Sequence, residues 1–170
     1  MDLYRYWQEA TRNKASVEGE LVENLTQLVD RLRRQQPKKV VNQLMRAGKF
    51  LEDLACYFSA EIMYSLAREV VSTQEADSLL MAKVLSTLGN LFQETGKYAK
   101  GMPLFEEALG IMKRNADTDQ EELAETLRQM GTLCKKQGKY PAAEEHFKNA
   151  LKITKVTPVL LDNMQVIFQL

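Results

Sequence analysis

Two stretches of the chain decide its fold: LGNLFQETGKYAKGMPLFEEALGIM at Leu88–Met112 and MGTLCKKQGKYPAAEEHFKNALKIT at Met130–Thr154. A third stretch, AGKFLEDLACYFSAEIMYSLAREVV at Ala47–Val71, aligns with them at offsets of 41 and then 42 residues. Internal repetition with a period of about 20 to 50 residues is typical of stacked supersecondary units. The sequence therefore predicts three copies of one unit.

Small and aromatic residues recur at matching positions of the three copies. The matches are Gly48 with Gly89 and Gly131, Tyr64 with Phe105 and Phe147, and Ala67 with Ala108 and Ala150. A small residue lets two helices approach closely, and a ring fills the space beside it. A shifted register that pairs Gly48 with Gly96 is rejected, because it sets polar residues against apolar ones. Each copy is thus predicted to be a pair of packed helices.

Turn and capping residues divide the repeats into six expected helices. Gly96 and Gly138 follow helix ends, where glycine accepts the left-handed conformation most easily, whereas the first copy has Ala55 and a less well specified turn. Ser72 and Asp119 each precede a glutamate by three residues, which is typical of a helix N-terminus. The expected helices span about 41–56, 57–72, 74–95, 98–115, 119–137 and 140–155.

These elements define the domain organisation that the sequence predicts. Residues 1–40 form a helical extension, in which Leu3–Arg12 is a short helix and a stripe of apolar residues marks a second, longer one. That stripe consists of Val17, Leu21, Leu25, Leu28 and Leu32. Pro37 is expected at the start of the next helix. Repeats follow at about 41–73, 74–115 and 116–155, and residues 156–170 either cap the stack or begin a truncated repeat.

Charge and cysteine content exclude several classes of partner. The 170 residues contain 23 Lys plus Arg and 23 Asp plus Glu, so no net field attracts nucleic acid or an anionic membrane. The two cysteines, Cys56 and Cys134, lie far apart and form no CxxC, which argues against a disulfide framework or a zinc site. No apolar stretch suits a signal peptide or a membrane span. A cytoplasmic chain is expected.

Nothing in the sequence supports catalysis or a cofactor. The spacing from Gly89 to Gly96-Lys97 superficially resembles a phosphate loop, but it has six intervening residues rather than four and follows no expected strand. His146 is the only histidine, so it cannot form a zinc site alone. Cys134 has no second histidine to act as its base. We therefore expect neither an enzyme nor a metal site.

The repeated pattern LGxxxxxxGxYxxAxxxFxxAL resembles the tetratricopeptide repeat over residues 41–155. The period near 42 is similar to that of kinesin light chains and nephrocystin-type proteins. This resemblance implies an all-α, right-handed superhelical stack of antiparallel helix pairs, whose concave groove is lined by the first helix of each pair and takes an extended peptide. The Leu-Asn-Asn-Leu-Ala run of kinesin light chains is absent, since Leu44-Met45-Arg46-Ala47 stands at that position of the first copy.

The leading part of the chain carries a second resemblance. Tyr6-Trp7-Gln8, the long expected helix and the segment 48–54 together look similar to the region that joins a nucleotide-switch module to the repeats in nephrocystin-type proteins. This resemblance implies that the chain is a fragment of a larger protein.

The groove side of the first helices is the candidate binding surface. It comprises Asn42, Met45, Arg46, Lys49, Lys83, Ser86, Thr87, Asn90, Arg128, Gln129, Thr132 and Lys135. Five of these residues are positive and none is acidic, which suits acidic side chains, a terminal carboxylate or the backbone of an extended peptide. Glu52, Asp53, Glu94 and Glu125 are expected near its rim.

The sequence leaves two functions open. The first is a protein-protein interaction scaffold with a protein or peptide ligand, possibly acidic, in this groove. The alternative is a structural, oligomerisation or regulatory helical array that takes no peptide. In either case the chain is expected to be a monomer or to associate weakly through the ends of the stack.

Overall fold

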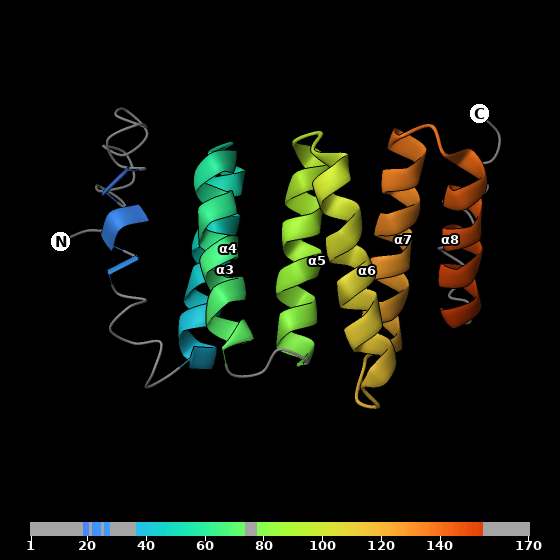
Figure 1. Cartoon of the computed structure of the whole chain (residues 1–170), viewed down its shortest axis with the longest axis horizontal. Coiled ribbons are helices and arrows are strands. Elements are labelled where there is room, and N and C mark those ends of the chain that lie inside the picture. The colour runs from blue at the N-terminus through green and yellow to red at the C-terminus, as the bar shows by residue number, and fades with distance from the viewer. Residues whose placement is uncertain (1–18, 21, 25, 28–36, 74–77, 155–170) are drawn as a thin grey trace. The chain divides into compact units, whose positions relative to one another are not determined.

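The computed structural model describes residues 19–20, 22–24, 26–27, 37–73 and 78–154. All regular structure within these ranges is helical, which confirms the all-α class (Figure 1). Residues 19–20, 22–24 and 26–27 are helical and fall within the expected amphipathic helix. The expected helix at Leu3–Arg12 and the expected cap at 156–170 lie outside the described residues.

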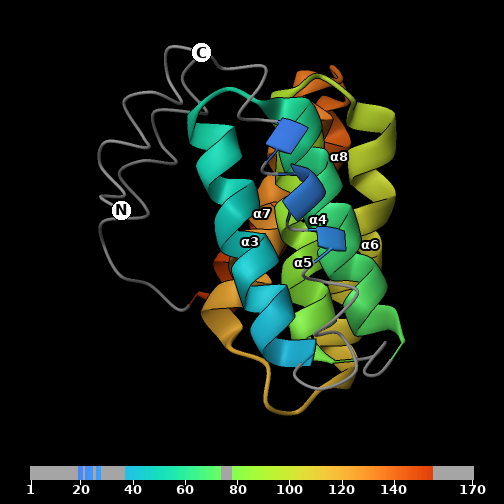
Figure 2. The same cartoon turned by 90° about the vertical axis from the view of Figure 1, so that its left-hand side faces the viewer.

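The chain divides into two compact units, Met1–Ala76 and Asp77–Leu170. In the first, α3 (Pro37–Asp53) and α4 (Tyr57–Ser72) pack side by side (Figures 1 and 2). The second contains α5 (Leu79–Glu94), α6 (Tyr98–Arg114), α7 (Gln120–Lys136) and α8 (Tyr140–Ile153). There, α5 pairs with α6 and α7 with α8, while α6 also packs on α7 and α5 touches α7. The helix pairs predicted from the repeats are confirmed.

One contact holds each pair together and confirms the register of the repeats. A Cβ atom added at Gly89 would lie 2.9 Å from Phe105 Cζ, and one added at Gly131 would lie 2.8 Å from Phe147 Cε1. In the first pair, a Cβ at Gly48 would overlap the ring of Tyr64. Real Cβ atoms do not approach rings this closely, so glycine at these positions lets an aromatic side chain cross the helix interface.

The aromatic residue of the first pair carries a hydroxyl group, which the matching phenylalanines of the other two pairs lack. Tyr64 is fully buried, and its hydroxyl donates a hydrogen bond of 2.7 Å to Glu52 Oε2. Burial, this hydrogen bond and the nearby charge of Glu52 raise the pKa of Tyr64 well above its usual range. Tyrosine is tolerated here because its hydroxyl reaches a partner at the edge of the pair.

The three turns within the pairs share one backbone geometry, including the turn that lacks glycine. Gly96 and Gly138 have φ of 73° and 74°, and Ala55 occupies the same position with φ of 57°. In each turn the next N–H donates to a carbonyl five residues earlier; Cys56 N, for example, lies 2.8 Å from Leu51 O. The first turn is therefore as well defined as the others, and alanine adopts a conformation that glycine accepts at lower energy.

Ala55→Gly should stabilise the chain by about 0.5 to 1 kcal/mol. The substitution removes the cost of a left-handed alanine, of about 1 to 2 kcal/mol, and loses part of that gain to the greater freedom of glycine in the unfolded chain. Ala55 is exposed, so no packing is lost. Denaturant unfolding checks the sign, with Gly138→Ala as the matched control that should lose a similar amount. Destabilisation by Ala55→Gly would contradict this explanation.

One of the two expected helix starts is confirmed and the other is wrong. Asp119 caps α7, and its Oδ1 accepts a hydrogen bond of 3.0 Å from Glu121 N. Ser72, in contrast, is the last residue of α4, and α5 is capped by Ser78, whose Oγ accepts from Met81 N at 3.2 Å. The end of α4 thus agrees with the expected span 57–72, whereas α5 begins at Leu79, later than the expected residue 74.

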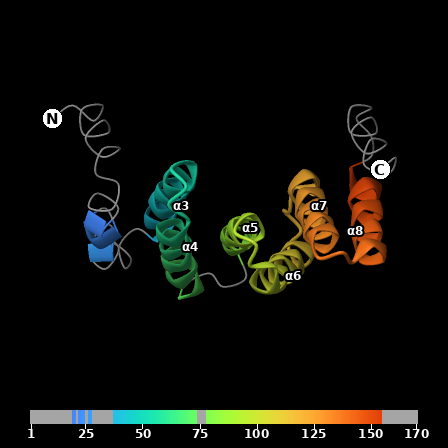
Figure 3. The same cartoon turned by 90° about the horizontal axis from the view of Figure 1, so that it is seen from above.

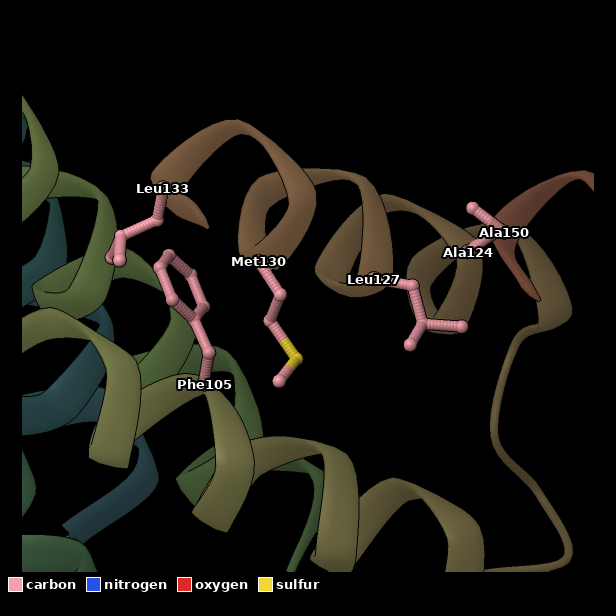
Figure 4. Packing of buried hydrophobic residues seen from close by; sticks show 6 residues of the cluster. All are labelled: Phe105, Ala124, Leu127, Met130, Leu133 and Ala150. Carbon is pink, nitrogen blue, oxygen red and sulfur yellow. The ribbon is translucent and has the colours of Figure 1, made fainter. Parts of the chain in front are cut away.

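The core of the second unit continues from one pair into the next. Phe105 of α6 points toward α7, where Met130 and Leu133 lie close to it (Figure 4). Leu127 and Ala124 of the same helix complete the cluster with Ala150 of α8. A second cluster joins Cys134, Ala143 and Phe147. This shared burial joins α6 of one pair to α7 and α8 of the next.

Candidate functional site

The structure brings eight of the twelve predicted site residues onto two neighbouring helices. We name these eight the α5–α7 wall: Lys83, Ser86, Thr87, Asn90, Arg128, Gln129, Thr132 and Lys135. Helices α5 and α7 touch each other and lie on the same side of α6 (Figure 3). The other four residues, on α3 of the first unit, are exposed at Asn42, Arg46 and Lys49 and partly buried at Met45.

The helical period explains why the wall residues share a face. On α5, Leu85, Leu88 and Gly89 are buried, Gly89 against Phe105 of α6, whereas Lys83 is exposed. The remaining wall residues of α5 are partly buried. Those of α7 show the same division, because Arg128 and Lys135 are exposed while Gln129 and Thr132 are partly buried. The wall thus has charged side chains in solvent and neutral polar ones nearer the backbone.

Polar side chains connect α5 to α7, and sequence reasoning missed two of them. Gln93 Nε2 donates to Gln129 Oε1 at 3.3 Å, and the hydroxyls of Ser86 and Thr126 lie 3.5 Å apart. Gln93 is only 6% exposed and Thr126 only 3%. Gln93 lies three residues after Asn90 on the same face, so the helical spacing could have included it in the site.

Two amide oxygens on α5, near these polar contacts with α7, have no hydrogen-bond donor among the residues that the structure describes. Within the described residues, Asn90 Oδ1 and Gln93 Oε1 are buried and accept no hydrogen bond. A buried acceptor without a partner costs about 1 to 3 kcal/mol. Apolar residues in place of Asn90 and Gln93 would avoid this cost. The two amide side chains therefore lower the stability of the fold.

In the first half of α7, Glu125 forms hydrogen bonds with two wall residues. Arg128 Nε lies 2.7 Å from Glu125 Oε2, and Arg128 Nη2 lies 2.5 Å from Oε1. Gln129 Nε2 donates to the same Oε1 at 2.5 Å. Partial burial opposes ionisation of Glu125, but the bonds from Arg128 and Gln129 and the charge of Arg128 outweigh it and lower the pKa of Glu125. The acid expected at the rim therefore bonds directly to the wall.

The cations of the wall and of α3 differ in whether they form ion pairs. Lys49 forms ion pairs with Asp53 at 3.1 Å and with Glu52 at 3.9 Å, and Arg128 is paired with Glu125. Lys83 and Lys135 are exposed and form no ion pair with any described residue. Of the three cations of the α5–α7 wall, the two lysines are thus the ones that remain available to a ligand.

The sequence also allows predictions about a reactive cysteine, a metal site and a membrane span, none of which concerns the wall residues. Cys134 is 3% exposed and packs against Ala143 and Phe147, as expected for a small apolar side chain. Burial raises the pKa of its thiol, which disfavours the reactive thiolate. Among the residues that the structure describes, no three His, Cys, Asp or Glu side chains gather in a way that could hold a metal ion. No described helix has the length and apolar character needed to cross a membrane.

Comparison with known proteins finds a family match for part of the chain and a similar fold for most of it. Residues 80–155 match the tetratricopeptide repeat. No curated protein matches the chain. Among solved structures, BtubC (BKLC) from P. vanneervenii is similar over 81% of this chain, with a TM-score of 0.68 and 20% sequence identity. The likeness covers 57% of BtubC, and at this identity it shows the fold alone. The matched segment contains helix pairs α5–α6 and α7–α8, and the glycine-to-ring contact recurs in each pair, so residues 80–155 have the sequence pattern and the fold of tetratricopeptide repeats.

Proposed function

We propose that the α5–α7 wall binds an extended segment of a partner protein, and that acidic side chains of this segment contact Lys83 and Lys135. Tetratricopeptide repeats generally mediate protein-protein interaction, and the family is typically a non-enzymatic scaffold. The observation that carries the proposal is the arrangement of amides and hydroxyls on two touching helices between two lysines without ion pairs. Such groups can bond to a peptide backbone and to carboxylates.

The proposal also covers the four predicted site residues on α3 and a cytoplasmic location. In the first unit, taken by itself, Asn42, Met45, Arg46 and Lys49 of α3 form a separate candidate surface for a protein partner. Arg46 supports this role because it is exposed and forms no ion pair with a described residue. Cys56 and Cys134 are buried thiols that are not joined in a disulfide, which supports a reducing compartment such as the cytoplasm.

A second candidate function is association through the end of the stack. Tyr98 of α6 packs against the cluster that includes Leu133 of α7, whereas the matching Tyr140 of α8 is 66% exposed. A repeat buries its face only where it has a neighbour, so the outer face of α8 could accept another protein or a second copy of the chain. Sedimentation of the chain and of Tyr140→Ser over a range of concentrations separates this function from peptide binding.

The double variant Lys83→Glu/Lys135→Glu should weaken binding of an acidic peptide by about 30-fold or more. Each exposed contact is worth about 0.5 to 1 kcal/mol, and reversal adds a similar repulsion, so the two sites together cost about 2 to 4 kcal/mol. The measurement is fluorescence anisotropy with labelled twelve-residue peptides whose glutamate content is varied. Affinity for the original chain should also fall as salt rises, because screening acts over about 8 to 10 Å.

Lys113→Glu/Lys152→Glu is the matched control for this test. It makes the same change in net charge at exposed positions of α6 and α8, the second helices of the two pairs. If both double variants weaken binding equally, the wall is not the site and only the overall charge matters. If neither does, the partner binds elsewhere.

A further inference from the structure

We propose that Glu125 is an internal competitor for ligand carboxylates and thereby determines which acidic segments the α5–α7 wall accepts. Its carboxylate occupies donors of Arg128 and Gln129 that an acidic residue of a bound segment would otherwise use. This inference rests on the proposed function and adds a specificity-determining residue to it.

The geometry of Glu125 is that of a bound carboxylate. Its two oxygens face two donors of Arg128, at 2.7 Å for Nε with Oε2 and 2.5 Å for Nη2 with Oε1. Two parallel N–H···O bonds of this kind are how arginine recognises a planar carboxylate in a ligand. Gln129 adds a third donor at 2.5 Å from Oε1. This set of donors is therefore already filled by a side chain of the protein.

The position of Glu125 is held by side chains from both helices. Gln129 donates to Glu125 and accepts from Gln93 on α5 at 3.3 Å, so both ends of its amide have partners. Gln93 is buried, which anchors this chain of hydrogen bonds at the contact between α5 and α7. Because the amide of Gln129 is engaged at both ends, its nitrogen is directed at Glu125.

The pairing changes the electrostatic pattern that a ligand meets. The Glu125–Arg128 pair is neutral, and the lysines without ion pairs, Lys83 on α5 and Lys135 on α7, belong to different helices. A ligand acid directed at Arg128 must displace Glu125 and leave that half-buried carboxylate without its partners. Segments with acids opposite the lysines and a neutral residue opposite Arg128 should therefore bind best.

An isosteric substitution separates this role from the fold. Glu125→Gln removes the competing charge, and Glu144→Gln on α8 is its matched control. Glu144 pairs with Lys148 at 2.5 Å and has 49% of its side chain exposed, against 50% for Glu125. Exposed pairs within one helix contribute little to stability, so both variants should remain folded.

The test measures the affinity of each chain for two labelled, capped twelve-residue peptides. One has glutamates at both ends and a central glutamine, and the other has a central glutamate as well. Glu125→Gln should tighten binding of the second peptide about tenfold, which corresponds to one recovered charge-assisted contact, and Glu144→Gln should change it less than twofold. The Arg128 Nε–H resonance should also shift during titration of the Glu125→Gln variant.

The outcomes distinguish failure of this inference from failure of the proposed function. If the lysine reversals abolish binding but Glu125→Gln behaves like Glu144→Gln, Glu125 is an ordinary surface pair and the inference is overturned. If the Arg128 resonance shifts in Glu125→Gln while the lysine reversals have no effect, the competitor role stands and the proposed binding mode fails. An unmoved resonance with no binding to either peptide overturns both.

Discussion

Replacing Gly131 with leucine should destabilise the chain by about 3 kcal/mol or more. A Cβ atom at this position would lie 2.8 Å from Phe147 Cε1 and 2.9 Å from its Cδ1 and Cζ, before any larger side-chain atom is added. Overpacking of a close helix contact typically costs about 1 to 3 kcal/mol, and leucine adds three further carbons beyond Cβ. The ring of Phe147 is itself packed against Cys134 and Ala143, so it has little room to move.

Gly138→Ala is the control for this substitution, since the two glycines lie seven residues apart and have different tasks. Gly138 has no atom within 4 Å of an added Cβ, but its φ of +74° disfavours alanine. The cost there should be about 1 kcal/mol, from backbone strain alone. Denaturant unfolding followed by circular dichroism gives both values. Equal losses for the two variants would contradict the assignment of Gly131 to the helix interface.

The register of the repeats could be predicted because each pair depends on one small residue and one ring. The glycine precedes the aromatic residue by 16 positions in all three copies: Gly48 and Tyr64, Gly89 and Phe105, Gly131 and Phe147. These residues meet in the structure. This contact joins two helices that follow each other directly in the chain. The glycine and the aromatic residue therefore recur at a fixed spacing that can be recognised in the sequence.

The start of the helix that follows α4 could not be predicted from local signals. Ser72 has a glutamate three residues later, whereas Ser78 has Met81, so the capping pattern favours the wrong serine. The structure has α4 end at Ser72, as its expected span 57–72 required, and uses Ser78 as the N-cap of α5. A capping preference of about 1 kcal/mol is too small to determine by itself which serine begins a helix.

In the candidate site, features within one helix could be predicted from the sequence, whereas contacts between helices could not. The exposed positions of Lys83, Arg128 and Lys135 follow from the helical period, and a pair between Glu125 and Arg128 is compatible with their three-residue spacing. The hydrogen bond from Gln93 to Gln129 joins residues 36 positions apart. It depends on how α5 and α7 contact each other, which one repeat alone does not specify.

Phe105→Ala should be the most damaging truncation in the second unit, with an expected loss of about 3 to 5 kcal/mol. Phe105 has no exposed surface, fills the space beside Gly89 and belongs to the cluster that includes Met130 and Leu133 of the next pair. Removing its ring would leave a cavity between α5, α6 and α7, and the cost of such a cavity adds to the lost burial.

Phe147→Ala tests whether contact between pairs contributes to this value. Phe147 occupies the matching position in the α7–α8 pair and is 9% exposed, against 0% for Phe105. In a stacked array, stability is the sum of each unit and its contacts with neighbours, so the residue that joins two pairs should cost more to remove. We expect Phe147→Ala to lose at least about 1 kcal/mol less than Phe105→Ala in denaturant unfolding. Equal losses would mean that the pairs fold on their internal contacts alone and that the arrangement of α5 beside α7 adds nothing to stability.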